Sequence, residues 1–207
     1  MKEGLFYLLV KPGDSSFFIL GGKSKMKKTK TRTLAIISIM SAIAFVLYYF
    51  ELSVGFLFPS AAFLKIDFSD VPAVFVGVVL GPLAGIAVEG IKNILHLIFI
   101  TKEAAASGEI GNFVSGVLFI VPIIIAINTN SKKKVLVAMV LGSVFMTIAM
   151  CFVNYFITLP LYGIPAAARM PLLMSSFIPF NLLKGAILSI VIYILWRNLA
   201  NTIARLK

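Results

Sequence analysis

The chain has 207 residues, of which 60% are hydrophobic and only 13% are charged. Soluble domains have roughly 45–50% apolar and about 25% charged residues, so this composition excludes an ordinary soluble protein and indicates an integral membrane protein. The net charge of +11 does not indicate a nucleic-acid partner, because eight of the 19 basic residues precede position 34 and no basic globular domain follows. Clustered Lys and Arg instead mark the cytoplasmic segments of a membrane protein.

The first 25 residues do not match the rest of the chain. Their two apolar runs are too short to span a bilayer and are separated by a polar Lys-Pro-Gly-Asp segment. A basic cluster typical of a membrane-protein start follows Met26. We expect residues 1–25 to be a poorly ordered extension from an over-long upstream start, and residues 26–207 to form a single membrane domain.

Six helices are predicted in that domain. Five apolar runs are long enough to span a bilayer, at about 33–50, 83–100, 110–127, 135–159 and 179–198. A shorter helix is predicted at 71–80, with Ser69 or Asp70 as its N-cap, Pro72 near its first turn and Gly81-Pro82 at its end. Polar and apolar residues alternate just before it, which predicts a short extended segment. The connectors 51–70, 101–109 and 159–175 are expected to be loops, the last one irregular because it is rich in proline.

Charge bias predicts the orientation of these helices. The basic residues form three groups, at 27–32, at 132–134, and at Arg197, Arg205 and Lys207. Six spans with both termini in the cytoplasm place all three groups on the cytoplasmic side, whereas five or seven spans would put one terminal group outside. The sequence therefore predicts an all-α bundle of six transmembrane helices with cytoplasmic N and C termini.

In this topology the intramembrane polar residues gather in the outer half of the bundle. They are Asn112, Asn154, Asn181 and Lys184, with the stripe Glu89, Lys92, Asn93 and His96 on the third helix. Such residues are costly in a bilayer and usually functional. Because the inner half is apolar, the layout indicates a pocket open to the outside under loops, and not a channel or proton relay.

Lys184 has no acid nearby in the sequence. It must extend towards the membrane surface, pair with a distant acid or bind a ligand, and we favour a ligand. The side-chain amides of Asn154 and Asn181 each offer a donor and an acceptor, which suits the edge of a pyrimidine-like ring. Neighbouring aromatic residues could enclose the ring plane, namely Phe152, Tyr155, Phe156, Phe177 and Phe180. Asp67, with Glu109 or Asn112, could accept hydrogen bonds from an attached polyol.

Several of these residues have a purely structural alternative. Glu89 and Lys92 could form a buried ion pair, His96 could pack at a helix interface, and Asn154 could tie two helices together. A rival hypothesis treats Glu89, Lys92 and His96 as the acid–base cluster of a membrane-embedded enzyme. The chain has one His, no phosphate-binding loop, no zinc motif and no nucleophile elbow. A transporter is therefore favoured, and it would need partner subunits to supply energy.

Five segments and Asn154 resemble a known family. The segments are FLKIDFSDVP at 63–72, GVVLGP at 77–82, IKNILHL at 91–97, GEIGNF at 108–113 and FNLLKG at 180–185. Over about residues 30–200 the chain is similar to the riboflavin-specific substrate-binding (S) components of energy-coupling factor (ECF) vitamin transporters. The first and last segments are the most specific to the riboflavin branch.

The resemblance implies a six-helix S-component that is not an enzyme and uses no cofactor, with riboflavin as its transported substrate. Flavin mononucleotide is a second candidate ligand, and an S-component or secondary transporter for another heteroaromatic vitamin is the alternative. By family pattern Asn154, Asn181 and Lys184 read the ring edge, and the connector around Lys65 and Asp67 lines or covers the pocket. In this family, small residues of the first helix dock on a membrane coupling subunit, which works with two cytoplasmic ATPases. Ser38 and Ala42 are the nearest match here, although Ser38 departs from the usual alanine. The resemblance therefore also implies a location in the prokaryotic plasma membrane.

Overall fold

The computed structural model of the protein describes residues 30–100, 106–129 and 131–206. The expected extension at 1–25 lies outside the described residues, as do the basic residues 27 and 28 on which part of the orientation argument depends. The described chain is predominantly helical, and the only two strands in these ranges are two residues long. The prediction of an all-α membrane fold is confirmed.

The main helices are α1 Lys30–Tyr49, α2 Asp70–Leu80, α3 Pro82–Phe99, α4 Ser107–Ile127, α5 Lys132–Val153 and α8 Ile178–Leu206. Short helices, α6 Leu159–Leu161 and α7 Ala166–Leu172, lie between α5 and α8. By length and composition, five helical segments can cross a membrane, namely Lys30–Tyr49, Pro82–Phe99, Ser107–Ile127, Lys132–Leu161 and Ala166–Leu199. Helix α2 has 11 residues and is shorter than these, as the sequence predicts.

The start of α2 differs from the prediction. Ser69 precedes the helix in a helical backbone conformation and its side chain makes no capping hydrogen bond. Its hydroxyl bonds instead to Asp67 and Lys92, so a tertiary contact replaces the expected local one. The other end agrees with the prediction, since Gly81 adopts a φ of 111° that favours glycine and its N–H donates to the Gly77 carbonyl.

The connector between the last two long helices is far more ordered than its proline content suggested. Only residues 162–165 are non-helical there. Two π-helical segments, Asn154–Thr158 and Leu173–Phe177, continue α5 and precede α8. Pro160 lies in the short helix α6 and Pro171 in α7, so the prediction of an irregular loop at 159–175 is wrong. Proline is compatible with a first helical turn, which explains part of this result.

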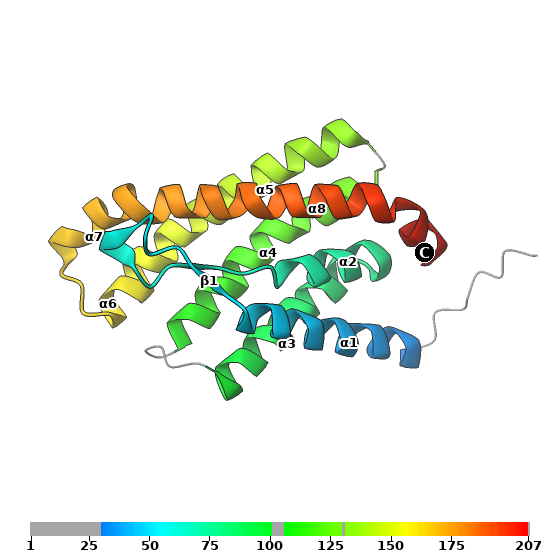
Figure 1. The fold of residues 1–207 in the computed structure, drawn as a ribbon, viewed down its shortest axis with the longest axis horizontal. Coiled ribbons are helices and arrows are strands. Elements are labelled where there is room, and N and C mark those ends of the chain that lie inside the picture. The colour runs from blue at the N-terminus through cyan, green and yellow to red at the C-terminus, as the bar shows by residue number, and fades with distance from the viewer. Residues whose placement is uncertain (1–29, 101–105, 130, 207) are drawn as a thin grey trace, which may run out of the picture.

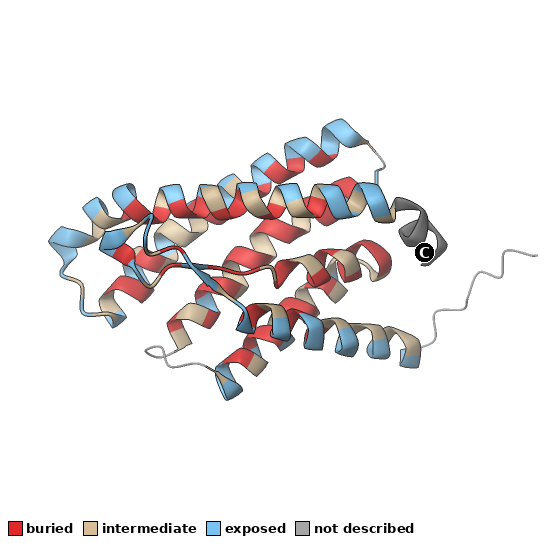
Figure 2. Ribbon diagram, viewed as in Figure 1, coloured by how far each residue is buried: buried red, intermediate tan, exposed pale blue. Residues whose placement is uncertain are grey.

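Helix α2 lies within the bundle, where the apolar core surrounds it (Figure 1). Its residues Ala73, Val76 and Val78 pack in one cluster with Phe119 and Ile123 of α4, among others. The outward faces of the longer helices carry many exposed large apolar side chains (Figure 2). This distribution is that of a bundle whose outer surface contacts lipid.

Figure 1 also shows how the ends of the bundle differ. The start of α1, the turn between α4 and α5 and the end of α8 lie at one end. Strands β1 (Leu52–Ser53) and β2 (Lys65–Ile66), helices α6 and α7 and the start of α4 lie at the opposite end. The antiparallel strands pair Leu52 with Ile66 and Ser53 with Lys65. The segment that carries Lys65 and Asp67, the start of α4 and the connection between α5 and α8 therefore share one end.

Candidate functional site

A pocket opens at this second end of the bundle. It contains about 710 Å³ of space between atoms, counting its open mouth. Its wall combines charged, amide, hydroxyl, aromatic and apolar side chains. The lining residues are Tyr48, Glu51, Phe63, Leu64, Lys65, Asp67, Ser107, Gly108, Gly111, Asn112, Ser115, Met150, Asn154, Thr158, Tyr162, Phe177, Phe180, Asn181 and Lys184.

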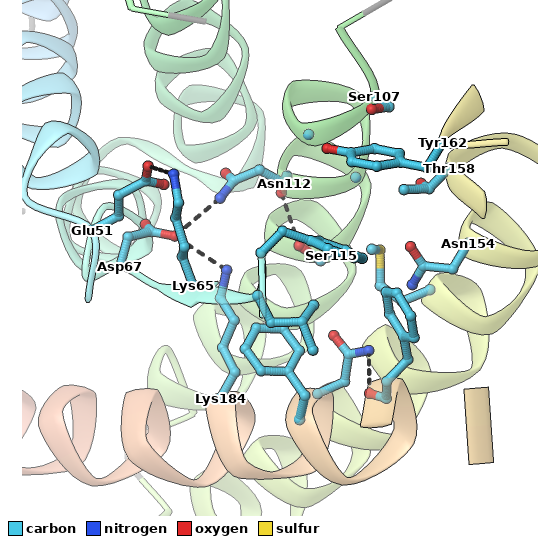
Figure 3. A pocket seen from close by; sticks show the side chains of 18 of the residues that line it. Glu51, Lys65, Asp67, Ser107, Asn112, Ser115, Asn154, Thr158, Tyr162 and Lys184 are labelled. Atoms are coloured by element: carbon cyan, nitrogen blue, oxygen red, sulfur yellow. Dashed lines mark hydrogen bonds and ion pairs between the residues drawn. The ribbon is translucent and has the colours of Figure 1, made fainter. Parts of the chain in front are cut away.

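The Asp67 carboxylate lies on one side of the pocket, where three segments of the chain meet (Figure 3). Its Oδ2 atom accepts a hydrogen bond from Asn112 Nδ2 at 3.1 Å and is 3.3 Å from Lys184 Nζ. Its Oδ1 atom accepts from the Ser69 N–H at 2.9 Å and from the Ser69 hydroxyl. A connector residue is thus held by α4 and α8 at once, which brings together three residues predicted from the sequence.

These contacts determine the charge of Asp67. Burial alone would raise the pKa of its carboxyl group, but the ammonium groups of Lys184 and Lys92 and two hydrogen bonds from Ser69 hold that pKa well below its usual range. Asp67 is therefore ionised at neutral pH. A ligand in the pocket meets a fixed negative charge next to the ammonium group of Lys184.

Lys184 pairs with a distant acid, which is one of the alternatives that the sequence left open. The role of Lys184 towards a ligand, which the sequence favoured, stays a prediction. Its distance of 3.3 Å to Asp67 exceeds the roughly 2.7–2.9 Å of strong charge-assisted hydrogen bonds. Since an ammonium group has three donors, the contact with Asp67 leaves Lys184 able to bind a ligand in the same pocket.

Asn154 lies across the pocket from Asp67 (Figure 3). It is only 2% exposed, and its Nδ2 atom has no hydrogen-bond partner among the described residues. A buried amide without a partner is unusual and calls for an explanation such as a ligand or water. It does not tie two helices together in this structure, so the structural alternative for Asn154 is not supported.

Asn181 lines the same pocket from the second turn of α8. Its Nδ2 atom donates to the Phe177 carbonyl at 2.8 Å, which fixes the amide plane and leaves Oδ1 and the second N–H of Nδ2 able to bind a ligand. Asn154, Asn181 and Lys184 are therefore brought to one pocket, as predicted. Asn154 and Lys184 approach it from different sides.

The aromatic residues of the pocket are only partly those expected. Phe177 and Phe180 line it. Phe152 and Phe156 are 63% and 67% exposed, stack on each other and do not line the pocket, because they lie on the outward face of their helix. Tyr155, also expected, is not a lining residue and contacts Arg169 instead.

Sequence reasoning missed three other aromatic residues of the wall, namely Tyr48, Phe63 and Tyr162. Phe63 and Tyr162 line the pocket and stack with ring centroids 5.0 Å apart. Phe63 shares the alternating face of the extended segment with Lys65 and Asp67, and that alternation could have identified it. No comparable signal marked Tyr162, since it lies in the connector whose structure was mispredicted.

Lys65 and Glu51 form an ion pair at the pocket wall. Their side chains are more exposed than that of Asp67, and Figure 3 shows the pair beside it. Lys65 was predicted as a residue that lines or covers the pocket, and it lies there. Glu51 was not predicted, because its partner depends on the pairing of β1 with β2.

The structure differs from the predicted site at Glu109, which was expected to contact a ligand. It does not line the pocket, and its Oε1 atom is 2.7 Å from His96 Nδ1. The His96 ring stacks on Tyr48 with centroids 3.8 Å apart. Glu109 is in the first turn of α4, and its side chain points towards α3 and not towards the pocket residue Asn112. The structural alternative for His96, a packed interface histidine, is confirmed.

Glu89 and Lys92 also form the buried ion pair that the sequence offered as a structural alternative. Lys92 Nζ is 2.7 Å from Glu89 Oε2 and 2.5 Å from Asp70 Oδ1. The residues of the rival enzyme hypothesis are thus paired with other buried side chains, and none of them lines the pocket. In the part of the chain that the structure describes, no group of three or more His, Cys, Asp or Glu side chains could hold a metal ion.

Ser38 and Ala42, the predicted docking residues, are both exposed on α1. They lie one helical turn apart on a face that no described residue covers. A second cavity lies beside α1, between α2 and α8, and is lined almost entirely by apolar atoms. It cannot offer the polar contacts of the first pocket.

The first pocket can therefore bind a molecule that combines a flat apolar surface with several hydrogen-bonding groups. Aromatic side chains provide the apolar walls, and Asn154, Asn181 and Lys184 provide donors and acceptors. Asp67 and Asn112 provide a separate polar region. These groups bind and orient a ligand, and their arrangement contains no activated nucleophile.

Comparison with known proteins agrees with a ligand-binding transporter component. Residues 32–196 match the model of the family described as "ECF transporter, substrate-specific component". The chain is 38% identical over 180 residues to the riboflavin transporter FmnP of Bacillus subtilis, covering 82% of this chain and 93% of that protein. It is 36% identical over 194 residues to the riboflavin transporter RibU of Staphylococcus aureus, covering 90% of this chain and all of that protein.

A solved structure of the S component of a bacterial ECF transporter has the same fold. The two superpose with a TM-score of 0.72 at 35% sequence identity, over 84% of this chain and 98% of the other. The pocket and its helices fall within the matched part of the chain, since the family match runs from residue 32 to residue 196.

Proposed function

We propose that this chain, which belongs to the family of ECF-transporter substrate-specific components, captures riboflavin at the outer face of the bacterial cell membrane and delivers it to an ATP-driven importer. Its relatives FmnP and RibU are riboflavin transporters. The chain is a multi-pass membrane protein and not an enzyme, because its family consists of transporter components. Riboflavin is its substrate and not a cofactor.

The observation that carries the assignment of the site is the unpartnered amide of Asn154. Its Nδ2 atom is buried without a hydrogen-bond partner in a pocket that it shares with Asn181 and Lys184. The isoalloxazine ring of riboflavin has alternating carbonyl and nitrogen groups along one edge, which such donors and acceptors complement. We assign the ring to the region between Asn154, Asn181 and the aromatic residues.

The polyol chain of riboflavin is assigned to the opposite polar region of the pocket. Asp67 is an ionised acceptor and Asn112 offers an amide oxygen, so both can accept hydrogen bonds from hydroxyl groups. Lys65, paired with Glu51, lies nearby and is assigned a covering role. Glu109 is left out of this assignment because it binds His96.

The partner subunits of this proposal are a membrane coupling subunit and two cytoplasmic ATPases. The exposed small residues Ser38 and Ala42 suit close approach of a partner helix. The apolar cavity beside α1 contains about 930 Å³ of space between atoms, counting its open mouth, and extends this surface towards α8. We assign the coupling subunit to this side of the bundle.

We also propose that the chain crosses the membrane six times, with α2 as the short second crossing and both termini in the cytoplasm. The start of α1, the lysines at 132–134 and Arg197 all belong to one end of the bundle (Figure 1). Positive charge is concentrated on cytoplasmic segments. The pocket end is then the outer face, which suits capture of an external vitamin.

The experiment is a titration of the full-length protein in detergent with riboflavin, followed by quenching of flavin fluorescence. Asn154→Ala and Asn181→Ala should each weaken binding, whereas Asn198→Ala, an exposed residue at the opposite end, should bind as the wild type does. Flavin mononucleotide serves as the competing ligand. Wild-type affinity in both pocket variants would refute the site, and failure of the wild type to bind riboflavin would favour another heteroaromatic vitamin.

A further inference from the structure

A cluster of buried charges lies behind the pocket, and the proposed function does not use it. At its centre is Lys92 of α3, which is fully buried. Its ammonium group contacts Asp70 Oδ1 at 2.5 Å, Glu89 Oε2 at 2.7 Å and the Ser69 hydroxyl at 2.6 Å. A buried ammonium group with three close acceptors has little freedom to move, because leaving any of them unpaired is unfavourable.

Ser69 connects this cluster to the pocket. Its hydroxyl accepts a hydrogen bond from Lys92 and donates one to Asp67 Oδ1. Ser69 itself is fully buried and does not line the pocket. The hydroxyl therefore contacts the cluster on one side and a pocket carboxylate on the other, while it cannot reach a ligand.

The two oxygens of Asp67 are used on different sides. Oδ1 is held by the hydroxyl and the N–H of Ser69, while Oδ2 accepts from Asn112 and Lys184 in the pocket. Fixing Oδ1 therefore fixes the direction in which Oδ2 points. Without the Ser69 hydroxyl, Oδ1 keeps a single donor, and the carboxylate can rotate about its side chain.

The surroundings show that the cluster has a defined geometry. A Cβ atom added at Gly116 of α4 would lie 2.5 Å from Glu89 Oε2 and 3.3 Å from Asp70 Oδ1. Only glycine lets α4 approach these carboxylates so closely. Helices α2, α3 and α4 thus enclose the cluster, and it can serve as a rigid support for the connector that carries Asp67.

We propose that Ser69 is a positioning residue for substrate binding, whose hydroxyl transmits the fixed position of the Lys92 cluster to the Asp67 carboxylate. It acts through Asp67 and does not touch the substrate. A pocket with correctly placed charges binds more tightly because less has to be ordered when the ligand arrives. This inference rests on the proposed riboflavin site.

The test compares riboflavin dissociation constants of full-length variants. Ser69→Ala should weaken binding about tenfold, and Ser69→Thr, which keeps the hydroxyl, should restore most of the affinity. Ser41→Ala is the matched control, because Ser41 is also buried but its hydroxyl has no partner among the described residues. It should bind as the wild type does.

A double-mutant cycle separates positioning from a general loss of stability. If Ser69 acts through Asp67, adding Ser69→Ala to Asp67→Asn should weaken binding by less than twofold beyond Asp67→Asn alone. Wild-type affinity in Ser69→Ala, or a full tenfold loss also in the Asp67→Asn background, would overturn the inference. Asn154→Ala is measured in parallel, because wild-type affinity there refutes the proposed site itself and not the role of Ser69.

Discussion

The most direct test of the pocket chemistry is the replacement of Lys184 by methionine. Methionine has a similar length and apolar stem but no charge, so the packing of α8 is largely preserved. The ammonium group lost in Lys184→Met is 3.3 Å from Asp67, so the variant removes one ion-pair partner of this buried carboxylate. Asp67 keeps its bonds from Asn112 and from Ser69, so the variant is expected to fold.

The size of the effect follows from what Lys184 gives the ligand. A hydrogen bond from a charged donor contributes about 1.5–3 kcal/mol. Since about 1.4 kcal/mol changes a dissociation constant tenfold, Lys184→Met should weaken riboflavin binding by roughly 10- to 150-fold. The contact with Asp67 is longer than a strong charge-assisted hydrogen bond, so the ammonium group can donate to a ligand while it stays close to the carboxylate.

The assay is equilibrium titration in detergent, with flavin fluorescence as the signal and a thermal melt of the ligand-free protein as the check on folding. Lys133→Met is the matched control, since Lys133 is exposed at the start of α5. A dissociation constant within twofold of the wild type in Lys184→Met would show that Lys184 serves only Asp67, and the assignment of the ring edge would fail.

Three further predictions concern charge, docking and packing. The pKa of Asp67 lies well below its usual value, so its ionised form stabilises the fold fully above about pH 3.9, and this contribution is lost gradually as the pH falls further. Thermal melts of the wild type and Asp67→Asn should differ by a constant amount from pH 7 to pH 5 and should begin to converge only below about pH 4. Ala42→Trp should leave riboflavin binding in detergent unchanged and abolish uptake by cells, and normal uptake would refute the docking surface. Gly116→Ala should destabilise the protein by about 1–3 kcal/mol in denaturation experiments because its Cβ meets Glu89, whereas Gly90→Ala, with its nearest atom at 3.8 Å, should be neutral or slightly stabilising.

Much of the fold was predictable because a bilayer imposes strong periodicity and length on its helices. The long apolar runs gave five helices, and Gly81-Pro82 correctly marked the end of the short one. The connector before α8 was mispredicted because proline was taken as a helix breaker. Pro160 lies at the start of helix α6 and Pro171 within helix α7 instead, and the π-helical segments Asn154–Thr158 and Leu173–Phe177 extend the helical structure on either side.

The site was predictable only where the type of a residue shows that its burial in a membrane is unfavourable. Buried amides and an ammonium group in a membrane helix had to be functional or paired, which pointed to Asn154, Asn181 and Lys184. Which partner each residue binds depends on the tertiary structure and cannot be read from the sequence. Lys184 meets Asp67 from more than a hundred positions away, and Glu109 turns to His96 although its neighbour in the helix, Asn112, lines the pocket.

The short helix α2 explains why the pocket has so many internal charges. Eleven helical residues extend about 16 Å at 1.5 Å per residue, roughly half of a 30 Å hydrocarbon core. In a six-helix topology, the rest of this crossing is made by the non-helical segment that contains Asp67 and Ser69. Such backbone is tolerated at membrane depth only where protein shields it and supplies hydrogen bonds. Asp67 supplies one to the Ser69 N–H through Oδ1, while its Oδ2 atom accepts from Asn112 in the pocket. Under the proposed six-helix topology, the carboxylate that satisfies the backbone of the short crossing is therefore also a polar group of the pocket wall.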